Sequence, residues 1–258
     1  MKLRFDKYQG TGNDFIIIDN RNIHFDKNNI ELVQHLCDRK FGIGSDGLIL
    51  IESHAEWDFN MVFFNPDGSQ SFCGNGSRCA MAFAKELGLI SDFAKFNSTD
   101  GYHEAIINSN GLVKLKMHNV SNIEVGDSYH YMETGSPHYN CFEKNIDKID
   151  VVARGREIRY NQRFKEIGTN VNFIEQLSGA IKVRTYERGV ENETLSCGTG
   201  VTACALSTAL LGKTRSGEIK VNTKGGDLSV SFTQTDTGFI DVWLIGPTKF
   251  VFNGEIEM

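Results

Sequence analysis

The sequence predicts a mixed α/β (α+β) fold of two pseudo-symmetric halves, each a curved sheet or barrel around a buried central helix. Three observations predict it: a cysteine-bearing turn that occurs twice, further landmarks that recur at a constant spacing, and β-rich segments on both sides of each apolar helix. With 258 residues, 40% of them hydrophobic, the chain is long enough to bury the core of one large or two small domains.

The repeat is clearest in the segments "SFCGNGSRCAMAFAKELG" and "LSCGTGVTACALSTALLG", which begin at Ser71 and Leu195. Their leading cysteines, Cys73 and Cys197, are 124 residues apart. The same spacing separates Gly44 from Gly168 and Gly88 from Gly212, and Thr11 precedes Thr134 by 123 residues. A register held over so long a stretch indicates the duplication of a domain of roughly 120 residues.

In the first half, an amphipathic helix is expected over residues 30–39, followed by strands at "LILIE" (48–52) and "DFNMVFF" (58–64). The Cys-Gly turn and its helix come next, and the helix ends at Gly88. The segment "HEAIINSNGLVKLKM" (103–117) contains the Asn-Gly signal of a hairpin.

The second half repeats this order. A less distinct helix is expected over 149–159, strands at "VNFIEQL" (171–177) and "AIKVRTYE" (180–187), a helix ending at Gly212, and a hairpin at 227–245. Both repeated helices are apolar nearly all round, which is typical of a buried helix. The expected halves are 1–118 and 119–247, with a linker at 118–130 and the active site in the cleft between the halves.

The two Cys-Gly turns predict thiol chemistry. A helix N-terminus leaves backbone N–H groups unpaired and carries a partial positive charge, so it favours a thiolate and binds a carboxylate. If two such turns face each other, one thiolate can remove an α-proton while the opposite thiol returns a proton to the other face. The N–H groups would stabilise the charge that develops on the carboxylate. This pattern predicts inversion of an amino-acid stereocentre.

Alternatives remain open at this point. A duplicated domain also duplicates structural cysteines, which are often buried as small apolar residues. Cys79 and Cys204 lie within the helices and are expected in the core, and Cys37 and Cys141 are expected to be structural. A regulatory disulfide between Cys73 and Cys197 would instead indicate a thiol redox protein. Zinc is disfavoured because the C-x5-C and C-x6-C spacings differ from common ligand pairs.

Glu187 and Arg188 break the repeat. A shift of 124 places them opposite Phe63 and Phe64. They could form an ordinary surface ion pair, which contributes little to stability. They precede the loop to Cys197, however, and arginine grips a carboxylate while glutamate accepts an ammonium. The pair is therefore predicted to hold a second amino-acid head group, away from the reacting carbon.

Composition excludes several other classes. The net charge is -6 and no basic run stands out, so no nucleic-acid partner is expected. The N-terminal segment lacks the apolar core of a signal peptide, and no apolar run reaches membrane-spanning length. Reduced thiols and a cytoplasmic location are expected. "GTGND" and "GIGSDG" match neither the dinucleotide nor the P-loop pattern.

The chain resembles the diaminopimelate epimerase family. The resemblance runs from "KYQGTGNDFIIID" through "FGIGSDG", "FFNPDGSQSFCGNGSRC", "GSPH" and "GTNVNFIE" to "YERGVENETLSCGTG" and "GPTKFVFNGEI". It implies a cofactor-independent, metal-free isomerase that interconverts L,L- and meso-diaminopimelate for lysine and cell-wall precursor synthesis. It also implies a possible homodimer, and a strand within 248–258 that completes the first half.

The resemblance further implies a role for each matched residue. Cys73 would deprotonate the L,L substrate and Cys197 would reprotonate it, with His138 beside the reacting amino group. The reacting carboxylate would be held by the backbone N–H groups of Gly74, Asn75, Gly198 and Thr199. Substrate would also be bound, mainly at its distal centre, by Asn13, Asn65, Asn172, Glu187 and Arg188.

One departure concerns Ser136, which stands where many family members carry asparagine before Pro-His. A serine hydroxyl is shorter than an amide, which puts its distal contact in question. Related enzymes of the same fold, such as a proline racemase-like or a PhzF-like enzyme, remain alternatives.

Overall fold

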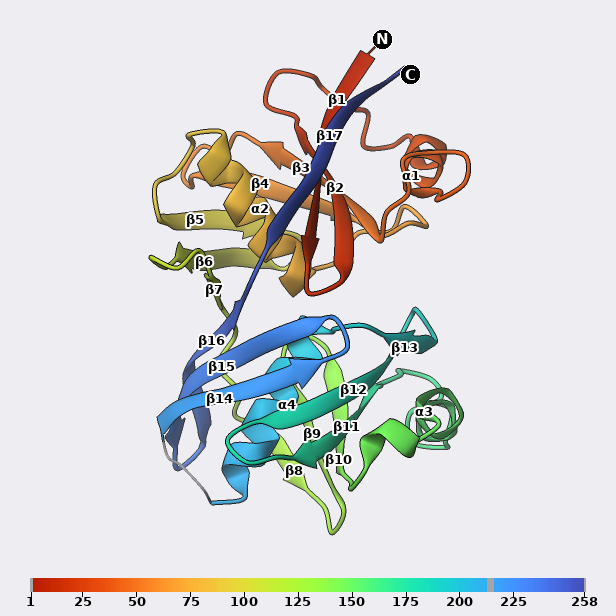
Figure 1. Cartoon of the computed structure of the whole chain (residues 1–258), viewed down its shortest axis with the longest axis vertical. Coiled ribbons are helices and arrows are strands. Elements are labelled where there is room, and N and C mark those ends of the chain that lie inside the picture. Colours follow the sequence, from red (N-terminus) through yellow and green to blue (C-terminus); the bar gives the residue numbers. More distant parts are fainter. Residues whose placement is uncertain (1, 213–215, 258) are drawn as a thin grey trace. The chain divides into compact units, whose positions relative to one another are not determined.

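The chain folds into two compact units in a computed structural model that describes residues 2–212 and 216–257. The first unit comprises Met1–Leu115 and Gly246–Met258, and the second comprises Lys116–Ile245 (Figure 1). The boundaries expected from the sequence were 118/119 and 247/248. The location of the active site in a cleft between the halves stays a prediction.

The strands of the first unit form a mixed sheet around one helix. They pair in the order β17 (Lys249–Glu257), β1 (Lys2–Gly10), β2 (Asn13–Asp19), β3 (Gly47–Glu52), β4 (Phe59–Phe64), β5 (Phe93–Ser98), β6 (Gly101–Ile107) and β7 (Val113–Lys116). The β2–β3 and β4–β5 pairs are parallel and the others antiparallel. Because β17 pairs with β1 from Lys2↔Glu257 to Gln9↔Lys249, the C-terminal strand belongs to the same sheet as the N-terminal one.

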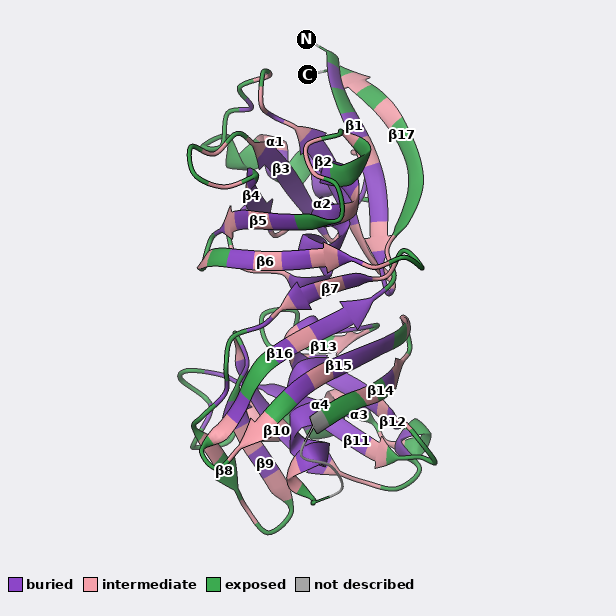
Figure 2. Cartoon of the chain, turned by 90° about the vertical axis from the view of Figure 1, so that its left-hand side faces the viewer, coloured by how far each residue is buried: buried purple, intermediate pink, exposed green. Residues whose placement is uncertain are grey.

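The helix at the centre of this sheet is α2 (Gly74–Glu86), which contacts β1, β2, β3, β4 and β6. Most of its residues are buried, as Figure 2 shows by colour. A second helix, α1 (Ile30–Cys37), packs its apolar side with β3 into a separate core cluster that includes Val33, Leu36 and Leu48. The apolar character that predicted a buried helix after Cys73 therefore reflects its sheet-enclosed position.

The second unit repeats this arrangement. Its strands pair in the order β8 (Ile123–Val125), β9 (Tyr129–Glu133), β10 (Pro137–Phe142), β11 (Asn170–Gln176), β12 (Ile181–Glu187), β14 (Ser216–Thr223), β15 (Gly226–Thr235) and β16 (Gly238–Gly246), and β13 (Asn192–Thr194) also pairs with β12. The buried helix α4 (Gly198–Leu210) contacts β9, β10, β11, β12, β14 and β15. A short 3-10 turn (Ile146–Lys148) and α3 (Val151–Arg159) lie against β11 and β12.

The two halves correspond closely, which confirms the predicted fold class. The helices α2 and α4 begin one residue after their cysteines and have the same length, 13 residues. The order of parallel and antiparallel pairs is also the same, from β2–β3–β4–β5–β6 to β10–β11–β12–β14–β15.

The register of one hairpin corrects a detail of the repeat. Leu48 pairs with Phe64, whereas Asn172, which lies 124 residues after Leu48, pairs with Thr185, 121 residues after Phe64. The loop between β3 and β4 is thus three residues longer than its counterpart, and the longer loop after β12 restores the spacing before Cys197. Glu187 and Arg188 are therefore not the counterparts of Phe63 and Phe64. They lie beyond the part of β12 that matches β4.

Element boundaries differ from expectation in three places. Helix α1 ends at Cys37, because Asp38 is extended (ψ 125°) and its carboxylate accepts from the N–H groups of the following turn. Helix α3 begins at Val151, because the Asp150 carboxylate caps it through Ala153 N–H at 3.0 Å. The expected linker at 118–130 was wrong, since it contains β8 and the start of β9.

No helix in the described part of the chain combines the length and apolar character needed to cross a membrane.

Candidate active site

Cys73 caps the N-terminus of α2. Its backbone is extended (φ −135°, ψ 108°), and its Sγ accepts a hydrogen bond from Gly76 N–H at 3.4 Å. The side chain is half-buried, while Gly74 and Asn75 are buried beneath it. The sulfur therefore lies at the positive end of a buried helix, where a negative charge is stabilised.

The turn between β1 and β2 supplies Asn13 to this thiol. The Asn13 Oδ1 lies 3.8 Å from Cys73 Sγ and 3.4 Å from Asn75 Nδ2. Its Nδ2 donates to the carboxylate of Asp46 at 2.7 Å, and Asp46 pairs with Arg39 at 2.7 Å. Because the amide nitrogen is held by Asp46, the oxygen of Asn13 faces the sulfur and the first turn of α2.

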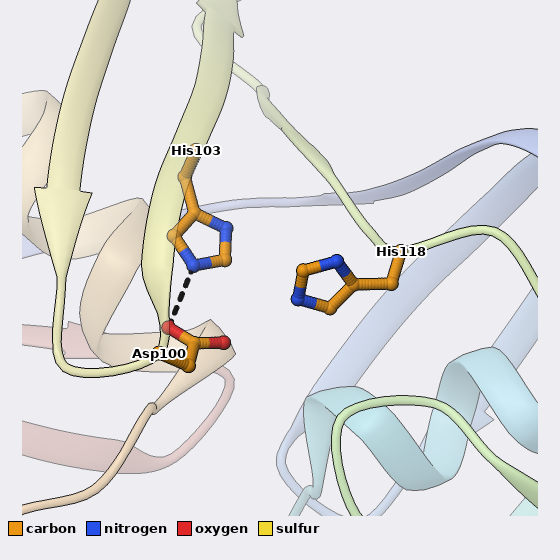
Figure 3. Close-up of side chains that lie close together, drawn as sticks. All are labelled: Asp100, His103 and His118. Carbon is orange, nitrogen blue, oxygen red and sulfur yellow. Dashed lines mark hydrogen bonds and ion pairs between the residues drawn. The ribbon is translucent and has the colours of Figure 1, made fainter.

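Asn65 organises the segment that leads from β4 to Cys73. Its Nδ2 donates to Ser69 O at 3.2 Å, Ser69 Oγ at 3.0 Å and Ser71 Oγ at 3.1 Å. The residue immediately before the cysteine, Phe72, stacks on the ring of His103 with centroids 4.5 Å apart. That ring is in turn held by Asp100 through His103 Nε2 at 2.8 Å (Figure 3). The contacts of Asn65 and Phe72 therefore hold the two ends of the segment that leads from β4 to Cys73.

Cys197 occupies the corresponding N-cap position of α4, with φ −122° and ψ 115°, but its side chain makes no capping hydrogen bond there. It is 8% exposed, and its Sγ lies 3.4 Å from Thr199 Oγ1. The hydroxyl of Thr199 also lies 2.9 Å from His138 Nε2, and its carbonyl accepts from Thr134 Oγ1 at 2.9 Å. In this half, side chains of β10 and its preceding turn hold the first turn of the helix.

The protonation of His138 follows from its neighbours. Asn172 Nδ2 donates to His138 Nδ1 at 3.0 Å, so Nε2 carries the ring proton and donates to Thr199 Oγ1. Full burial, helped by the charge of Arg188, lowers the pKa of His138 to about 3, so the ring is neutral near pH 7. The Thr199 hydroxyl is left to donate its own proton to Cys197 Sγ.

The amide of Asn172 is fully engaged inside the unit. Besides His138, its Nδ2 contacts Asn140 Oδ1 at 2.7 Å, and its Oδ1 accepts from Thr185 Oγ1 at 2.7 Å. The side chain is 0% exposed. The structure therefore places Asn172, which was expected to contact substrate, in the network that orients His138.

Asn170 was missed in the sequence. Its Nδ2 donates to Ser136 Oγ at 2.8 Å and to Pro137 O at 3.0 Å, and its Oδ1 accepts from Arg188 N–H at 2.9 Å. It thus links the residue before Pro-His to the Glu-Arg pair. Alternation on β11 offers a signal, because Asn170 and Asn172 lie on the same face of the strand.

Glu187 is the last residue of β12, and Arg188 follows it in the next turn. The Glu187 carboxylate accepts from Thr194 Oγ1 at 2.8 Å, and the exposed Arg188 donates from Nη1 to Ile167 O at 3.1 Å. The stem of Arg188 passes over Gly168, whose φ is +81° and where a Cβ would lie 2.6 Å from Arg188 Cδ. A glycine at this position therefore permits the arginine to lie along the loop.

The remaining cysteines are buried thiols. Burial raises the pKa of Cys37 and of Cys141 to about 12, and it also raises the pKa of Cys79 and Cys204 well above the ordinary value of a thiol. Cys37, Cys79, Cys141 and Cys204 are free thiols. Cys73 and Cys197 differ from the other four because each occupies the N-cap position of a buried helix.

Comparison with known proteins shows the family of this chain. The family model described as diaminopimelate epimerase matches residues 5–123 and 130–251. A diaminopimelate epimerase from Flavobacterium psychrophilum is 50% identical over 256 residues, covering 98% of this chain and 100% of the relative. One from Hydrogenobaculum is 41% identical, covering 97% of each chain.

Solved structures of lower identity share the fold. A PhzF-family protein from Bacillus anthracis has a TM-score of 0.78 at 15% identity, covering 100% of both chains. A hydroxyproline epimerase from Agrobacterium vitis has a TM-score of 0.72 at 14% identity, covering 99% of this chain and 92% of that one. The family match and the extent of the 50% identity decide the assignment: the chain belongs to the diaminopimelate epimerase family of isomerases.

Proposed function

We propose that the protein interconverts L,L- and meso-diaminopimelate, with Cys73 and Cys197 as the two acid–base groups. The observation that carries the proposal is the matched pair of cysteines, each the N-cap of a buried helix whose first residues are Gly-Asn or Gly-Thr. The family match supplies the substrate. The Glu187–Arg188 pair, with its partner Asn170, favours a substrate with two amino-acid groups and therefore disfavours a proline racemase-like enzyme.

In the L,L to meso direction, the thiolate of Cys73 removes the α-hydrogen as a proton. The electron pair of the C–H bond moves into the carboxylate, and Cys197 S–H then delivers its proton to the opposite face of the carbon. The backbone N–H groups of Gly74, Asn75, Gly198 and Thr199 stabilise the carboxylate charge. Turnover leaves Cys73 protonated and Cys197 as thiolate, and the reverse reaction starts from that state.

The Thr199 hydroxyl serves the second step. Since it receives a hydrogen bond from neutral His138, it donates toward Cys197 Sγ and stabilises the thiolate that forms there. Asn172 acts through His138 by fixing its tautomer. This assignment gives Asn172 an indirect role in place of a substrate contact.

The distal amino-acid group is assigned to polar side chains of both units: Asn13, Asn65, Ser136, Asn170, Glu187 and Arg188. Arg188 binds the distal carboxylate and Glu187 the distal ammonium. The short Ser136 hydroxyl already accepts a hydrogen bond from the amide of Asn170, so we assign the two residues to the distal group together. A cytoplasmic homodimer is part of the proposal, testable by cell fractionation and light scattering.

The test is proton exchange with solvent. Reduced enzyme is incubated with L,L-diaminopimelate in deuterium oxide, and the α-position is followed by NMR and mass spectrometry. The proposal predicts entry of one deuterium with formation of the meso isomer. Cys73→Ala and Cys197→Ala are each expected to abolish net epimerisation while circular dichroism stays unchanged. Lack of deuterium incorporation by folded, reduced protein would refute the proposal. Turnover of disulfide substrates would favour a redox protein instead.

A further inference from the structure

Arg78 is the largest fully buried side chain of the described residues. It lies on the second turn of α2, five residues after Cys73, and is 0% exposed. A buried arginine needs an explanation, because arginine is rarely fully buried without a partner of opposite charge.

The contacts of the Arg78 guanidinium are few and neutral. Nη1 donates to Gly74 O at 3.5 Å and Nη2 to Thr11 Oγ1 at 3.2 Å, and the buried Nε has no acceptor. Within residues 2–212 and 216–257, no carboxylate forms an ion pair with it. Arg184, the other largely buried arginine, pairs with both oxygens of Glu193 at 2.7 and 2.8 Å.

Among the described residues, no acid therefore compensates the charge of Arg78. Burial lowers the pKa of Arg78 to about 10, which still leaves the guanidinium cationic near pH 7. An isolated buried charge is strongly unfavourable, so an anion that forms beside it is correspondingly stabilised.

Acidic groups on the elements around α2 are engaged elsewhere. On β1, Asp6 accepts a hydrogen bond from Asn253, and Tyr8 bonds Glu86 of α2. On β2, Asp14 pairs with Lys7 and Arg39, and Asp19 pairs with Arg21. On β3, Glu52 pairs with Lys27. On β6, Glu104 bonds Tyr102, and His103 bonds Asp100. The strand β4 carries no titratable side chain.

Two thiols remain as possible anions, Cys79 and Cys73. Both would be attracted to Arg78 when ionised. Cys79 is fully buried, and burial raises its pKa strongly even with Arg78 nearby, so it stays a thiol. Cys73 is half-buried and accepts from Gly76 N–H. The β1–β2 turn also joins the two groups, since Thr11 accepts from Arg78 while Asn13 contacts Cys73.

The second half carries no cation at the matching helix position, and its Arg188 is an exposed residue after β12 whose charge acts on His138. The residue 124 positions after Arg78 is Thr202, which is also 0% exposed. Its hydroxyl donates to Gly198 O at 3.0 Å, the counterpart of the Gly74 carbonyl that Arg78 contacts. A neutral hydroxyl thus stands behind Cys197 where a guanidinium stands behind Cys73.

We propose that Arg78 is a positioning residue that assigns the thiolate of the substrate-free enzyme to Cys73 and leaves Cys197 protonated. The inference rests on the proposed function, in which the Cys73 thiolate removes the proton from the L,L substrate. The substrate-free enzyme is then already in the form that reacts with that isomer. It requires no contact between Arg78 and the substrate.

The test is the pH dependence of alkylation by iodoacetamide in substrate-free enzyme, read separately for Cys73 and Cys197 by peptide mass spectrometry. In wild-type protein, the midpoint pH of alkylation is expected to be lower for Cys73 than for Cys197. Arg78→Met is expected to raise the Cys73 midpoint by about one unit or more, which corresponds to a roughly tenfold slower reaction near pH 7. Arg78→Lys keeps the charge, so its Cys73 midpoint is expected to stay close to that of wild type.

Two controls separate charge from packing. Arg184→Met removes a buried arginine that pairs with Glu193, and it is expected to lower stability without moving the Cys73 midpoint. Cys79→Ala tests whether the neighbouring thiol is the anion, and it too should leave the midpoint in place. The midpoints of both variants are compared with that of wild type only where the circular dichroism spectra agree.

Several outcomes would overturn the inference. In wild-type protein, a Cys197 midpoint at or below that of Cys73 refutes it even if Arg78→Met does not fold. An unchanged Cys73 midpoint in folded Arg78→Met, with a raised KM, would instead assign Arg78 to the substrate carboxylate. Because alkylation needs no substrate, these results are independent of whether the protein epimerises diaminopimelate.

Discussion

The glycines at the third position of α2 and α4 allow a matched test of the packing around the candidate site. A Cβ added to Gly200 would lie 2.8 Å from Asn172 Oδ1, 3.3 Å from His138 Cε1 and 3.4 Å from Cys197 Cβ. A Cβ added to its counterpart Gly76 would lie 3.2 Å from the terminal methyl of Ile49 and at ordinary contact distance from Cys73. The same substitution therefore meets a fixed polar network in one half and a flexible side chain in the other.

Asn172 cannot easily yield to the new methyl group. Its oxygen is held by Thr185 and its nitrogen by His138 and Asn140, so moving it breaks buried hydrogen bonds. Alanine favours a helix by about 0.5–1 kcal/mol relative to glycine, whereas overpacking costs about 1–3 kcal/mol and an unsatisfied buried group about 1–3 kcal/mol. We therefore expect Gly200→Ala to lose about 1–4 kcal/mol, and Gly76→Ala to stay within about 1 kcal/mol of wild type.

The assay is urea unfolding followed by circular dichroism, with kcat and KM measured on the same preparations. Because His138 and Thr199 move with Asn172, Gly200→Ala is also expected to lower kcat at least roughly tenfold. The Gly76→Ala variant is the control for placing an alanine in a helix N-terminus beside a site cysteine. If Gly200→Ala is as stable and as active as Gly76→Ala, the role given to the Asn172–His138 network is wrong.

Three further results are expected. The pKa of His138 is lowered in the folded state to about 3, below its unfolded value of about 6.5, so its contribution to stability is complete above pH 6.5 and is lost as the pH falls toward 3. The free energy of unfolding should consequently fall less steeply below pH 6.5 in His138→Gln than in wild type, with His130 and carboxylates of lowered pKa such as Asp14 and Glu193 contributing the remaining slope; equal slopes would contradict this. Arg188→Met should raise KM at least roughly tenfold with a smaller change in kcat, because it removes the proposed contact with the distal carboxylate; an unchanged KM would exclude the distal site. Iodoacetamide at pH 8 should label Cys73 and Cys197 well before Cys37, Cys79, Cys141 and Cys204, since burial raises the pKa of the latter four; early labelling of Cys79 or Cys204 would show that the helix cores open.

The fold was predictable because its strongest signals are local. The apolar composition after Cys73 and Cys197 predicted two buried helices, and both were confirmed with equal length. Strands such as β1 and β2 were missed in the sequence, where charged residues of β1 such as Lys7 and Arg4 obscure the alternation. Burial of Lys7 depends on its ion pair with Asp14, which only the folded sheet brings near.

The position of each cysteine at the N-terminus of a buried helix could be predicted from the sequence, but the contacts of the surrounding residues could not. Asn172 and Asn170 share one strand face, and only the contacts show that Asn170 reaches Ser136 and Arg188 while Asn172 orients His138. The counterpart of Glu187 was misassigned because a constant spacing of 124 hides compensating differences in loop length. Burial of Arg78 could not be predicted from the sequence, since the tip of an arginine side chain within an apolar helix is normally exposed to solvent.

The most direct measurement for the two-thiol mechanism is a crystal structure of the reduced enzyme with diaminopimelate bound. The account predicts that the Sγ atoms of Cys73 and Cys197 lie on opposite faces of one α-carbon, each about 3.5 Å from it, with the carboxylate on the first-turn N–H groups of both helices. A bound substrate whose α-carbon is approached by one sulfur alone, or by neither, would contradict the account.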